Sequence, residues 1–431
     1  MRDTPGLASD AGWNYAALAA TTAVGAATMF LIAGRMGAAA LGVFAQLYAV
    51  HVIGAQLAVL GVHDSTQKHV AERALDGQSD APIVTGALWV VLVASTALAG
   101  WLVLAAGTIG ALVGSADVGR GLYLVAPGLV GFALNKVLFG ALNGRGALRR
   151  YAWMQLVRAG LVLIAVVAIV APALPAYAVG GIFAAAELLL LPALLAAVRP
   201  WRGAAAARAA TEQPWWRRHL GFGGRGLVNG ILLETHLRVD VVTLSYFVSD
   251  RAVGVYAFAG LFAEGVYQVP VVIRTVAYPT LVRLASRQDR AALARTTRRL
   301  AVAGGGACAT VALAVAFVYP ILASWFDPEF VRGGLPVLHI LLTGMTAYAF
   351  FVPFDQLLLQ SGLPGRQSVL MTLYVAANVI LNLALIPRFG LVGAAAATAA
   401  SLLVAAALLL LASWVWLGYR GGVLLHRAPV A

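Results

Sequence analysis

Residues 40–45 read ALGVFA, and residues 252–257 read AVGVYA. The offset, 252 − 40 = 212, is close to half of the 431 residues of the chain. Each string follows a long apolar segment and a short polar turn, and each begins the next apolar segment. Six similar residues are weak evidence alone, because Ala, Gly and Val are abundant here. The matching surroundings predict two similar halves, and two-half membrane proteins are commonly transporters with a site between the halves.

The composition is that of a membrane protein with many spans. Hydrophobic residues make up 61% of the chain and charged residues only 11%, whereas soluble proteins carry about 25% charge. Apolar runs of roughly 20 residues, the length needed to cross about 30 Å of hydrocarbon, recur throughout. We therefore predict an all-α polytopic membrane protein, and the alternative of a soluble all-helical protein is disfavoured.

The apolar runs predict about 12 transmembrane helices, six in each half. Those of the first half are expected at 13–33, 40–62, 82–106, 121–142, 151–171 and 177–197. Those of the second half are expected at 221–248, 253–281, 300–323, 334–359, 368–386 and 392–417. Six is an even number, so both halves start on the same side of the membrane. The repeat is then parallel, with its pseudo-two-fold axis along the membrane normal.

Three regions follow from this division. We expect an N-terminal six-helix lobe at 1–200, a cytoplasmic linker with an interfacial segment at 201–220, and a C-terminal six-helix lobe at 221–431. The linker ends with the string PWWRR at 214–218. Aromatic rings at headgroup level and Arg toward anionic lipid are typical of an interfacial anchor. A regulatory or partner-binding role for this segment is the alternative.

Basic residues predict the orientation. With the N-terminus in the cytoplasm, twenty Lys and Arg fall in inside segments and five in outside loops. The positive-inside rule favours this arrangement, with both termini cytoplasmic in the inner (plasma) membrane. The net charge of +13 is therefore interpreted as a topology signal, and no nucleic-acid partner is expected. Residues 1–12 are polar and the first apolar run is long, so no cleavable signal peptide is expected.

Ionisable residues inside the spans are candidates for a substrate site, because each costs about 2.5–3.5 kcal/mol at mid-membrane. Span seven holds the largest group: Arg225, Glu234, His236, Arg238 and Asp240. On a continuous helix, four polar residues fall within about a 60° arc: Arg225, Asn229, His236 and Asp240. We interpret this stripe as lining a water-filled cavity, with contact to a neighbouring helix as the alternative. Glu234 and Arg238, four residues apart, are expected to pair on the opposite face.

The other intramembrane charges are scattered. Span eight carries Glu264 and Arg274, and Arg274 is expected either to line the cavity or to extend to the headgroups. His51, in span two, is expected to pack by hydrogen bonding rather than relay protons.

Four further charged residues lie in spans four, five, six and ten. Lys136 and Arg158 are expected to extend their charges to the headgroups. Glu187 and Asp355 either couple to protons or pair with a basic neighbour.

Bases are as frequent as acids within the membrane, so an anionic or phosphate-bearing substrate is favoured over an organic cation. The sequence contains no Gly-x-x-x-x-Gly-Lys-[Ser/Thr] nucleotide loop and no Cys/His metal cluster. No large loop is present to house an enzyme site. We therefore expect a transporter without a metal or cofactor, powered by an ion gradient, the membrane potential or the substrate gradient.

Three stretches together resemble the polysaccharide flippases of the multidrug/oligosaccharidyl-lipid/polysaccharide exporter superfamily. The first is 37–72, with LGVF at 41–44. The second is RVD at 238–240, followed by VGVY at 253–256 and YP at 278–279. The third is 378–401, with Asn382, IP at 386–387 and an Ala-rich run.

The resemblance implies two six-helix lobes that form a V around a central cavity. It implies transport of an undecaprenyl-diphosphate-linked oligosaccharide, such as a polysaccharide or O-antigen repeat unit, from the cytoplasmic to the outer leaflet. By position, the arginines for its diphosphate are Arg225, Arg238 and Arg274. The remaining candidate cavity residues are His236, Asp240, Glu264, His51 and Lys136. Further expected partners are membrane lipids, a coupling proton or sodium ion, and a polysaccharide polymerase or glycosyltransferases.

Other functions stay open. A multidrug exporter coupled to protons or sodium would use Asp240, Glu264 or Asp355. The lipid II flippases of the superfamily usually have fourteen spans and several Arg in span one, whereas this chain has twelve predicted spans and only Arg35 at the end of the first. A membrane glycan polymerase or ligase is disfavoured by the short loops.

Overall fold

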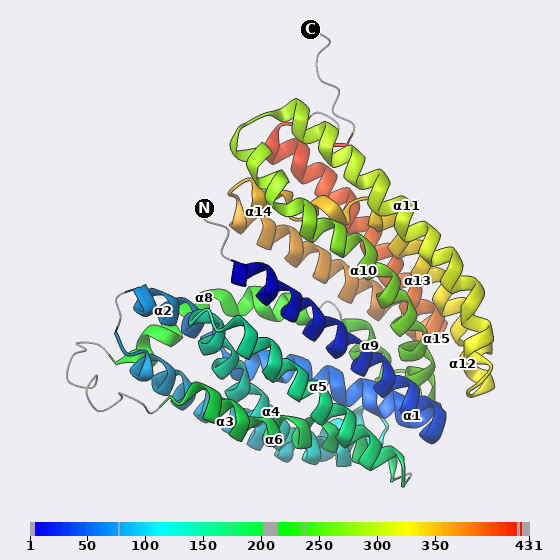
Figure 1. Ribbon diagram of the computed structural model, residues 1–431. Coiled ribbons are helices and arrows are strands. Elements are labelled where there is room, and N and C mark those ends of the chain that lie inside the picture. Colours follow the sequence, from blue (N-terminus) through cyan, green and yellow to red (C-terminus); the bar gives the residue numbers. More distant parts are fainter. Residues whose placement is uncertain are drawn as a thin grey trace. The chain divides into compact units, whose positions relative to one another are not determined.

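The computed structural model describes residues 5–75, 78–172, 174–200, 214–235, 238–419 and 423–424. Every regular element in these ranges is a helix. The chain divides into two compact units, Met1–Thr235 and His236–Ala431 (Figure 1). Among the described residues, nine helices are long and apolar enough to cross a membrane. The prediction of an all-α polytopic membrane protein is confirmed.

Most of the described residues of the first unit belong to helices. In chain order they are α1 (Pro5–Val59), α2 (Val62–Leu75), α3 (Ala81–Leu112), α4 (Ala116–Gly144), α5 (Leu148–Val170), the 3₁₀ helix η1 (Ala176–Gly180), α6 (Gly181–Val198) and α8 (Trp215–Thr235).

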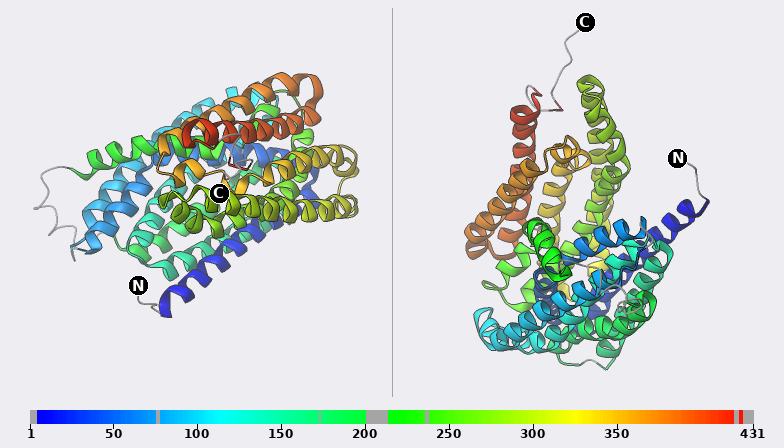
Figure 2. Two further views of the ribbon diagram at one scale, coloured as in Figure 1. Left: turned by 90° about the horizontal axis from the view of Figure 1, so that it is seen from above. Right: turned by 90° about the vertical axis from the view of Figure 1, so that its left-hand side faces the viewer.

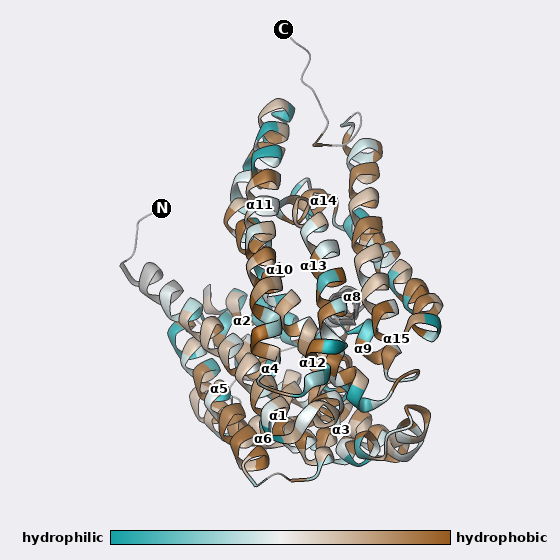
Figure 3. Ribbon diagram, turned by 90° about the vertical axis from the view of Figure 1, so that its right-hand side faces the viewer, coloured by the Kyte–Doolittle hydropathy of each residue, from teal (hydrophilic) through white to brown (hydrophobic). Residues whose placement is uncertain are grey.

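The second unit mixes long and very short helices. They are α9 (Val239–Leu244), α10 (Asp250–Ser286), α11 (Arg290–Ala323), α12 (Pro328–Arg332), α13 (Gly334–Ala349), the 3₁₀ helix η3 (Val352–Phe354), α14 (Leu357–Gln360) and α15 (Pro364–Leu417). Figure 3 shows hydrophobic residues along most of the helices, with hydrophilic residues gathered at the start of α11.

Helix α15 contains two spans that fold back on each other. Asn378 Nδ2 donates to Ser401 Oγ at 2.9 Å, although 23 residues of straight helix would separate them by about 35 Å. The reversal is at Gly390, whose φ of 55° and ψ of −127° are not helical (Figure 2). Such a backbone favours glycine, because residues with a Cβ rarely adopt this positive φ. Asn378 thus bonds across the two spans, whereas Asn382 Nδ2 donates within its own span, to the carbonyl and the Oδ1 of Asn378 at 2.9 and 3.2 Å.

Helix α1 also contains two spans. Gly37, with φ 81° and ψ −177°, interrupts it, and the chain turns back there (Figure 1). Since α1 and α15 hold two expected spans each, the nine long helices account for eleven of the twelve predicted spans. The remaining one, span seven, is not a single helix.

Span seven is broken between α8 and α9. Helix α8 ends at Thr235, and Arg238 precedes α9 with a non-helical φ of −128° and ψ of −4°. The prediction of one continuous helix is therefore wrong, and the side chain of Glu234, the expected partner of Arg238, lies outside the described residues. Charged or ionisable residues stand at every second position from 234 to 240. In a helix, residues two apart point in nearly opposite directions, so a continuous span would turn some of these charges toward lipid.

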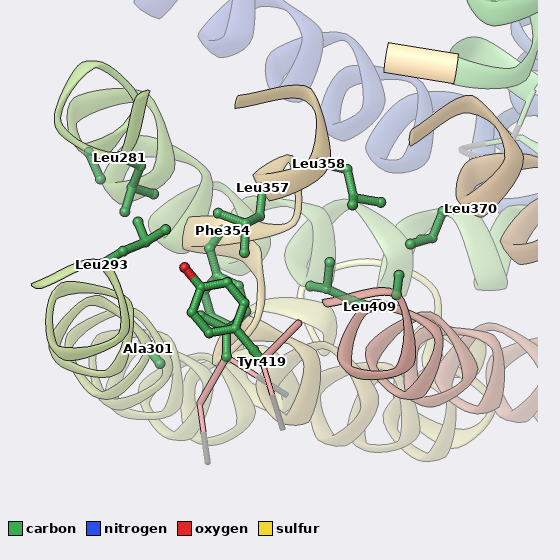
Figure 4. Close-up of a cluster of buried hydrophobic side chains, with 12 residues drawn as sticks. Leu281, Leu293, Ala301, Phe354, Leu357, Leu358, Leu370, Leu409 and Tyr419 are labelled. Carbon is green, nitrogen blue, oxygen red and sulfur yellow. The ribbon is translucent and has the colours of Figure 1, made fainter. Parts of the chain in front are cut away.

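Helix α8 packs against α1, α2 and α3, so the first unit extends beyond the lobe boundary expected at 220. Trp215 is only 7% exposed and joins a cluster of buried side chains in the first unit, whereas Trp216 is 46% exposed. Half of the aromatic pair expected at the interface is therefore part of the core. Figure 4 shows the corresponding cluster in the second unit, around Phe354 and Leu281.

The two repeat strings are buried in their own units. Leu41 and Val43 of α1 are 0% and 1% exposed, and Val253 and Val255 of α10 are 0% and 2% exposed. Each string therefore supplies core contacts near the start of a long helix. The residues that carry the repeat have the same packing role in both halves.

Candidate functional site

A polar cluster in the first unit surrounds the ring of Phe132 on α4. The His51 ring of α1 lies edge-on to it, with centroids 5.4 Å apart. Arg158 Cζ of α5 lies 5.0 Å from the ring centroid, and Lys136 Nζ of α4 lies 5.7 Å from it. Cations over an aromatic face are attracted by its quadrupole, so this ring helps to hold two basic groups within an apolar helix bundle.

Arg158 is held by a buried carboxylate. Its Nε donates to Glu187 Oε1 of α6 at 2.7 Å, and its Nη2 contacts the same oxygen. Asn135 Nδ2 donates to Glu187 Oε2 at 2.9 Å, and the side chain of Glu187 is 3% exposed. Glu187 thus pairs with a basic neighbour, Arg158, which is one of the two roles expected for it. The expectation that Arg158 extends to the headgroups is wrong, because Glu187 offers its charge a partner inside the unit.

Lys136 and His51 have different surroundings. Lys136 Nζ donates to Gln56 Oε1 at 2.5 Å, so its ammonium also stays within the unit. The His51 ring stacks on Phe183 with centroids 4.7 Å apart, and it is 3% exposed. Among the described residues, His51 Nδ1 has no hydrogen-bond partner. His51 therefore packs between helices, but its ring contacts Phe132 and Phe183 instead of forming the expected hydrogen bond.

In the second unit, the charges of the broken span contact α10. Arg238 Nη1 lies 3.4 Å from Glu264 Oε1. The hydroxyl of Tyr256 donates to Asp240 Oδ2 at 2.5 Å. Tyr256 belongs to the second repeat string, so the string that starts α10 also anchors the carboxylate of α9.

A second ion pair joins α10 to the turn before α14. Arg274 Nη1 donates to Asp355 Oδ2 at 2.7 Å, and their side chains are 24% and 15% exposed. Gln367 Nε2 donates to the backbone carbonyl of Asp355 at 3.1 Å, which fixes the turn. Arg274 therefore pairs inside the unit, and Asp355 takes the pairing option of its two expected roles.

The predicted site residues fall into separate groups. His51 and Lys136 lie in the first-unit cluster, Arg238, Asp240 and Glu264 lie together where α9 meets α10, and Arg274 pairs with Asp355. Of the other two predicted site residues, His236 lies outside the described residues. Arg225 lies on α8, and its side chain is outside the described part of the chain.

Three residues of the first-unit cluster were not predicted from the sequence: Gln56, Phe132 and Asn135. A usable signal was present, because Asn135 and Lys136 are adjacent polar residues in an apolar span and Phe132 is one helical turn before Lys136. In the part of the chain that the structure describes, no group of three or more His, Cys, Asp or Glu is placed to hold a metal ion.

No family model matches the chain. Among curated proteins, it is similar to the probable flippase AglR of Haloferax volcanii, with 27% identity over 175 residues. The aligned part is 39% of this chain and 36% of that relative, so the match spans about a third of the relative's length.

Two solved structures resemble the whole chain. The lipid II flippase MurJ in an inward closed conformation has a TM-score of 0.69 and 13% identity, over 92% of this chain and 86% of MurJ. An inward-facing multidrug resistance MATE family transporter of the MOP superfamily has a TM-score of 0.70 and 16% identity, over 93% of this chain and 94% of the transporter. These likenesses show that the chain has the fold of these two proteins, which is the fold that the resemblance in the sequence implied.

Proposed function

We propose that the protein is a flippase for an undecaprenyl-diphosphate-linked oligosaccharide. It moves a polysaccharide or O-antigen repeat unit from the cytoplasmic to the outer leaflet of the plasma membrane by alternating access. The fold and the partial similarity to a probable flippase support transport as the activity class. The choice of an anionic lipid-linked substrate rests on the basic residues inside the helices.

The observation that carries the proposal is the Arg274–Asp355 pair. A guanidinium group has five N–H donors, and the structure places one Arg274 nitrogen 2.7 Å from Asp355. The side chain is 24% exposed, so the remaining donors are accessible. A diphosphate carries more charge and more acceptor oxygens than one carboxylate, and Arg binds phosphate in a bidentate manner. The carboxylate thus holds the arginine in a fixed orientation until a phosphate group arrives.

Arg238 and Glu264, where α9 meets α10, form a second arginine–carboxylate pair of this kind. This ion pair is longer, at 3.4 Å, and Glu264 is 46% exposed, so less free energy is lost when a substrate phosphate displaces this carboxylate. We propose that Arg238 and Arg274 bind the diphosphate or acidic sugars. Arg225, His236, Asp240, His51 and Lys136 stay proposed contacts of the same substrate.

The test replaces both arginines. Arg238→Ala/Arg274→Ala should abolish export of the surface polysaccharide in a deletion strain, while the protein level in the membrane stays unchanged. The matched control is Arg283→Ala/Arg287→Ala. It removes two arginines from the C-terminal end of α10 and should leave export intact. Arg238→Lys/Arg274→Lys, which keeps the charge but loses the planar fork, should retain part of the activity. Full export by the double Ala variant would refute the site.

A cation-coupled multidrug exporter is the second candidate. The MATE-type fold and the carboxylates Asp240, Glu264 and Asp355 of the second unit favour it. Drug sensitivity of a deletion strain with unchanged polysaccharide would support this function instead.

A lipid II flippase is the third candidate, and the likeness to MurJ favours it. Rescue of a strain depleted of its lipid II flippase would support it. The proposed partners, a polysaccharide polymerase or glycosyltransferases, are checked by co-purification from cells that make the polysaccharide.

A further inference from the structure

Two guanidinium groups of the first unit lie near the ring of one buried tryptophan. Arg73 Cζ of α2 lies 5.6 Å from the ring centroid of Trp215, and Arg218 Cζ of α8 lies 4.9 Å from it. The two Cζ atoms are therefore no more than 10.5 Å apart, the sum of those distances. Trp215 itself is 7% exposed, so the ring is a fixed platform.

Two other cations extend this group. Lys68 Nζ of α2 lies 4.9 Å from the ring centroid of Phe222, and Arg217 Cζ lies 5.0 Å from that of Trp216. We call these four cations and their rings the α2–α8 surface. Each head group is held over a ring, so less conformational entropy remains to be lost when an anion binds.

One carboxylate, that of Glu72, lies at this surface and pairs with Lys68 rather than with either arginine. Glu72 lies 3.7 Å from Lys68 and 2.8 Å from His69. Arg73 donates to the Ser79 carbonyl at 3.3 Å. Within the described residues, neither Arg73 nor Arg218 forms an ion pair. Like charges held close together repel each other, and an anion bound at both would remove that repulsion.

The position of Trp215 indicates which anion is available. A Cβ on Gly86 would lie 2.8 Å from Trp215 Cβ, so Trp215 packs near the beginning of α3. One helical turn later on α3, Trp89 is 66% exposed on a helix apolar enough to cross the membrane. Trp216 and Leu220 on α8 are also exposed, at 46% and 40%. Cations and exposed apolar groups at the end of a spanning helix match the headgroup and upper acyl region of a bilayer.

We propose that Arg73 and Arg218, supported by Lys68 and Arg217, bind the phosphate of an anionic phospholipid headgroup. The site is distinct from the substrate residues proposed above and does not depend on the flippase function. It ties α8 to α2 across a shared lipid, so lipid composition would affect the stability of the first unit. The same basic chemistry would suit a soluble phosphate, which the experiment below separates from the lipid.

The experiment uses the purified full chain in a neutral detergent, titrated with phosphatidylglycerol or phosphatidylcholine, with bound lipid counted by native mass spectrometry. We expect saturable binding of phosphatidylglycerol and none of comparable affinity for phosphatidylcholine. Arg73→Gln/Arg218→Gln should bind phosphatidylglycerol about 30-fold more weakly. The control Arg287→Gln/Arg295→Gln loses the same charge from exposed positions in the second unit and should bind like the unaltered chain.

Three results would overturn the proposal. The first is wild-type affinity in Arg73→Gln/Arg218→Gln. The second is an equal loss in the control, which would mean attraction by net charge alone. The third is displacement of the lipid by equimolar inorganic phosphate, which would mean a soluble phosphate site. If the Gln variant does not elute as a single species, Arg73→Lys/Arg218→Lys replaces it, with a weaker loss expected because both charges stay; unchanged affinity in a phosphate-free buffer would count against the arginine fork.

Discussion

Glu187 is the residue on which the polar interior of the first unit depends. It accepts from Arg158 and from Asn135 and is almost fully buried. Such an acid balances a base that would otherwise stand uncompensated among apolar helices. The sequence marked both charges but not the pair, because 29 residues separate them and only the packing of α5 on α6 brings them together.

Glu187→Gln is therefore expected to destabilise the protein by about 3 kcal/mol, because it leaves the partly buried Arg158 without a counter-charge. The measurement is the thermal or denaturant midpoint of the purified protein in detergent. The control Arg158→Met/Glu187→Met removes both charges and should recover most of the loss. A Gln variant as stable as the unaltered chain would show that the pair contributes little.

His219 gives the first unit a pH dependence. Its Nε2 donates to the Ile83 carbonyl at 2.9 Å, so its Nδ1 accepts from the Ser65 hydroxyl at 2.9 Å. Burial lowers the pKa of His219 from 6.5 to about 4, although the bond to Ile83 opposes this. Between pH 4 and 6.5 the unfolded chain binds a proton at this site that the folded chain does not. The neutral imidazole thus stabilises the fold fully above pH 6.5, and this contribution is lost as the pH falls toward 4.

We expect the unfolding midpoint of the protein to decrease as the pH is lowered from 7 to 4.5. A pKa shift of this size corresponds to a loss of roughly 3 kcal/mol in the free energy of unfolding. His219→Gln keeps a polar group but cannot titrate, so it should show a smaller decline over the same range. Parallel pH curves for the two proteins would mean that groups other than His219 account for the effect.

At the scale of elements, α8 shows how one helix is fixed by close backbone contact. A Cβ on Gly223 would lie 2.3 Å from the Leu60 carbonyl oxygen, and Gly61, with φ 68°, would meet Gly223 at 2.6 Å. No side chain fits between α8 and the turn joining α1 to α2. This contact explains why α8 belongs to the first unit although hydropathy placed most of it in the second lobe.

Gly223→Ala should displace α8 and lower stability by about 1–3 kcal/mol. The neighbouring Gly224 has open space around its Cβ position, so Gly224→Ala should be neutral or stabilising by up to about 1 kcal/mol. The two midpoints, measured side by side, separate contact from helix propensity. Equal effects of both substitutions would exclude the close contact.

Hydropathy predicted eleven of the twelve spans, since long apolar runs have few alternatives to a helix in a membrane. It did not predict the break between α8 and α9. Local spacing suggested that Glu234 would pair with Arg238, and it gave no sign that Arg238 also contacts Glu264, 26 residues later. Candidate residues were thus identifiable by their type, but their partners depend on tertiary packing. Arg274 and Asp355, 81 residues apart, illustrate the same limit.

At the scale of the whole molecule, the distribution of Lys and Arg predicts which side each turn faces. The exposed Arg388 lies in an expected outside loop, and the exposed Arg287 lies in an expected inside segment. In a Cys308→Ser background, Arg388→Cys should react with a membrane-impermeant maleimide in intact cells. Arg287→Cys should react only after permeabilisation. The reverse pattern would invert the topology.

The broken span also bears on how the chain enters the membrane during synthesis. Arg238 and Asp240 leave the ribosome before Tyr256 and Glu264, which neutralise or bond them. Until α10 emerges, the charged segment lacks these α10 contacts, and its insertion from the translocon into the membrane is unfavourable. We expect it to wait beside the translocon and to enter together with α10 as a hairpin. The order of synthesis would then make the second repeat string a requirement for inserting the segment made just before it.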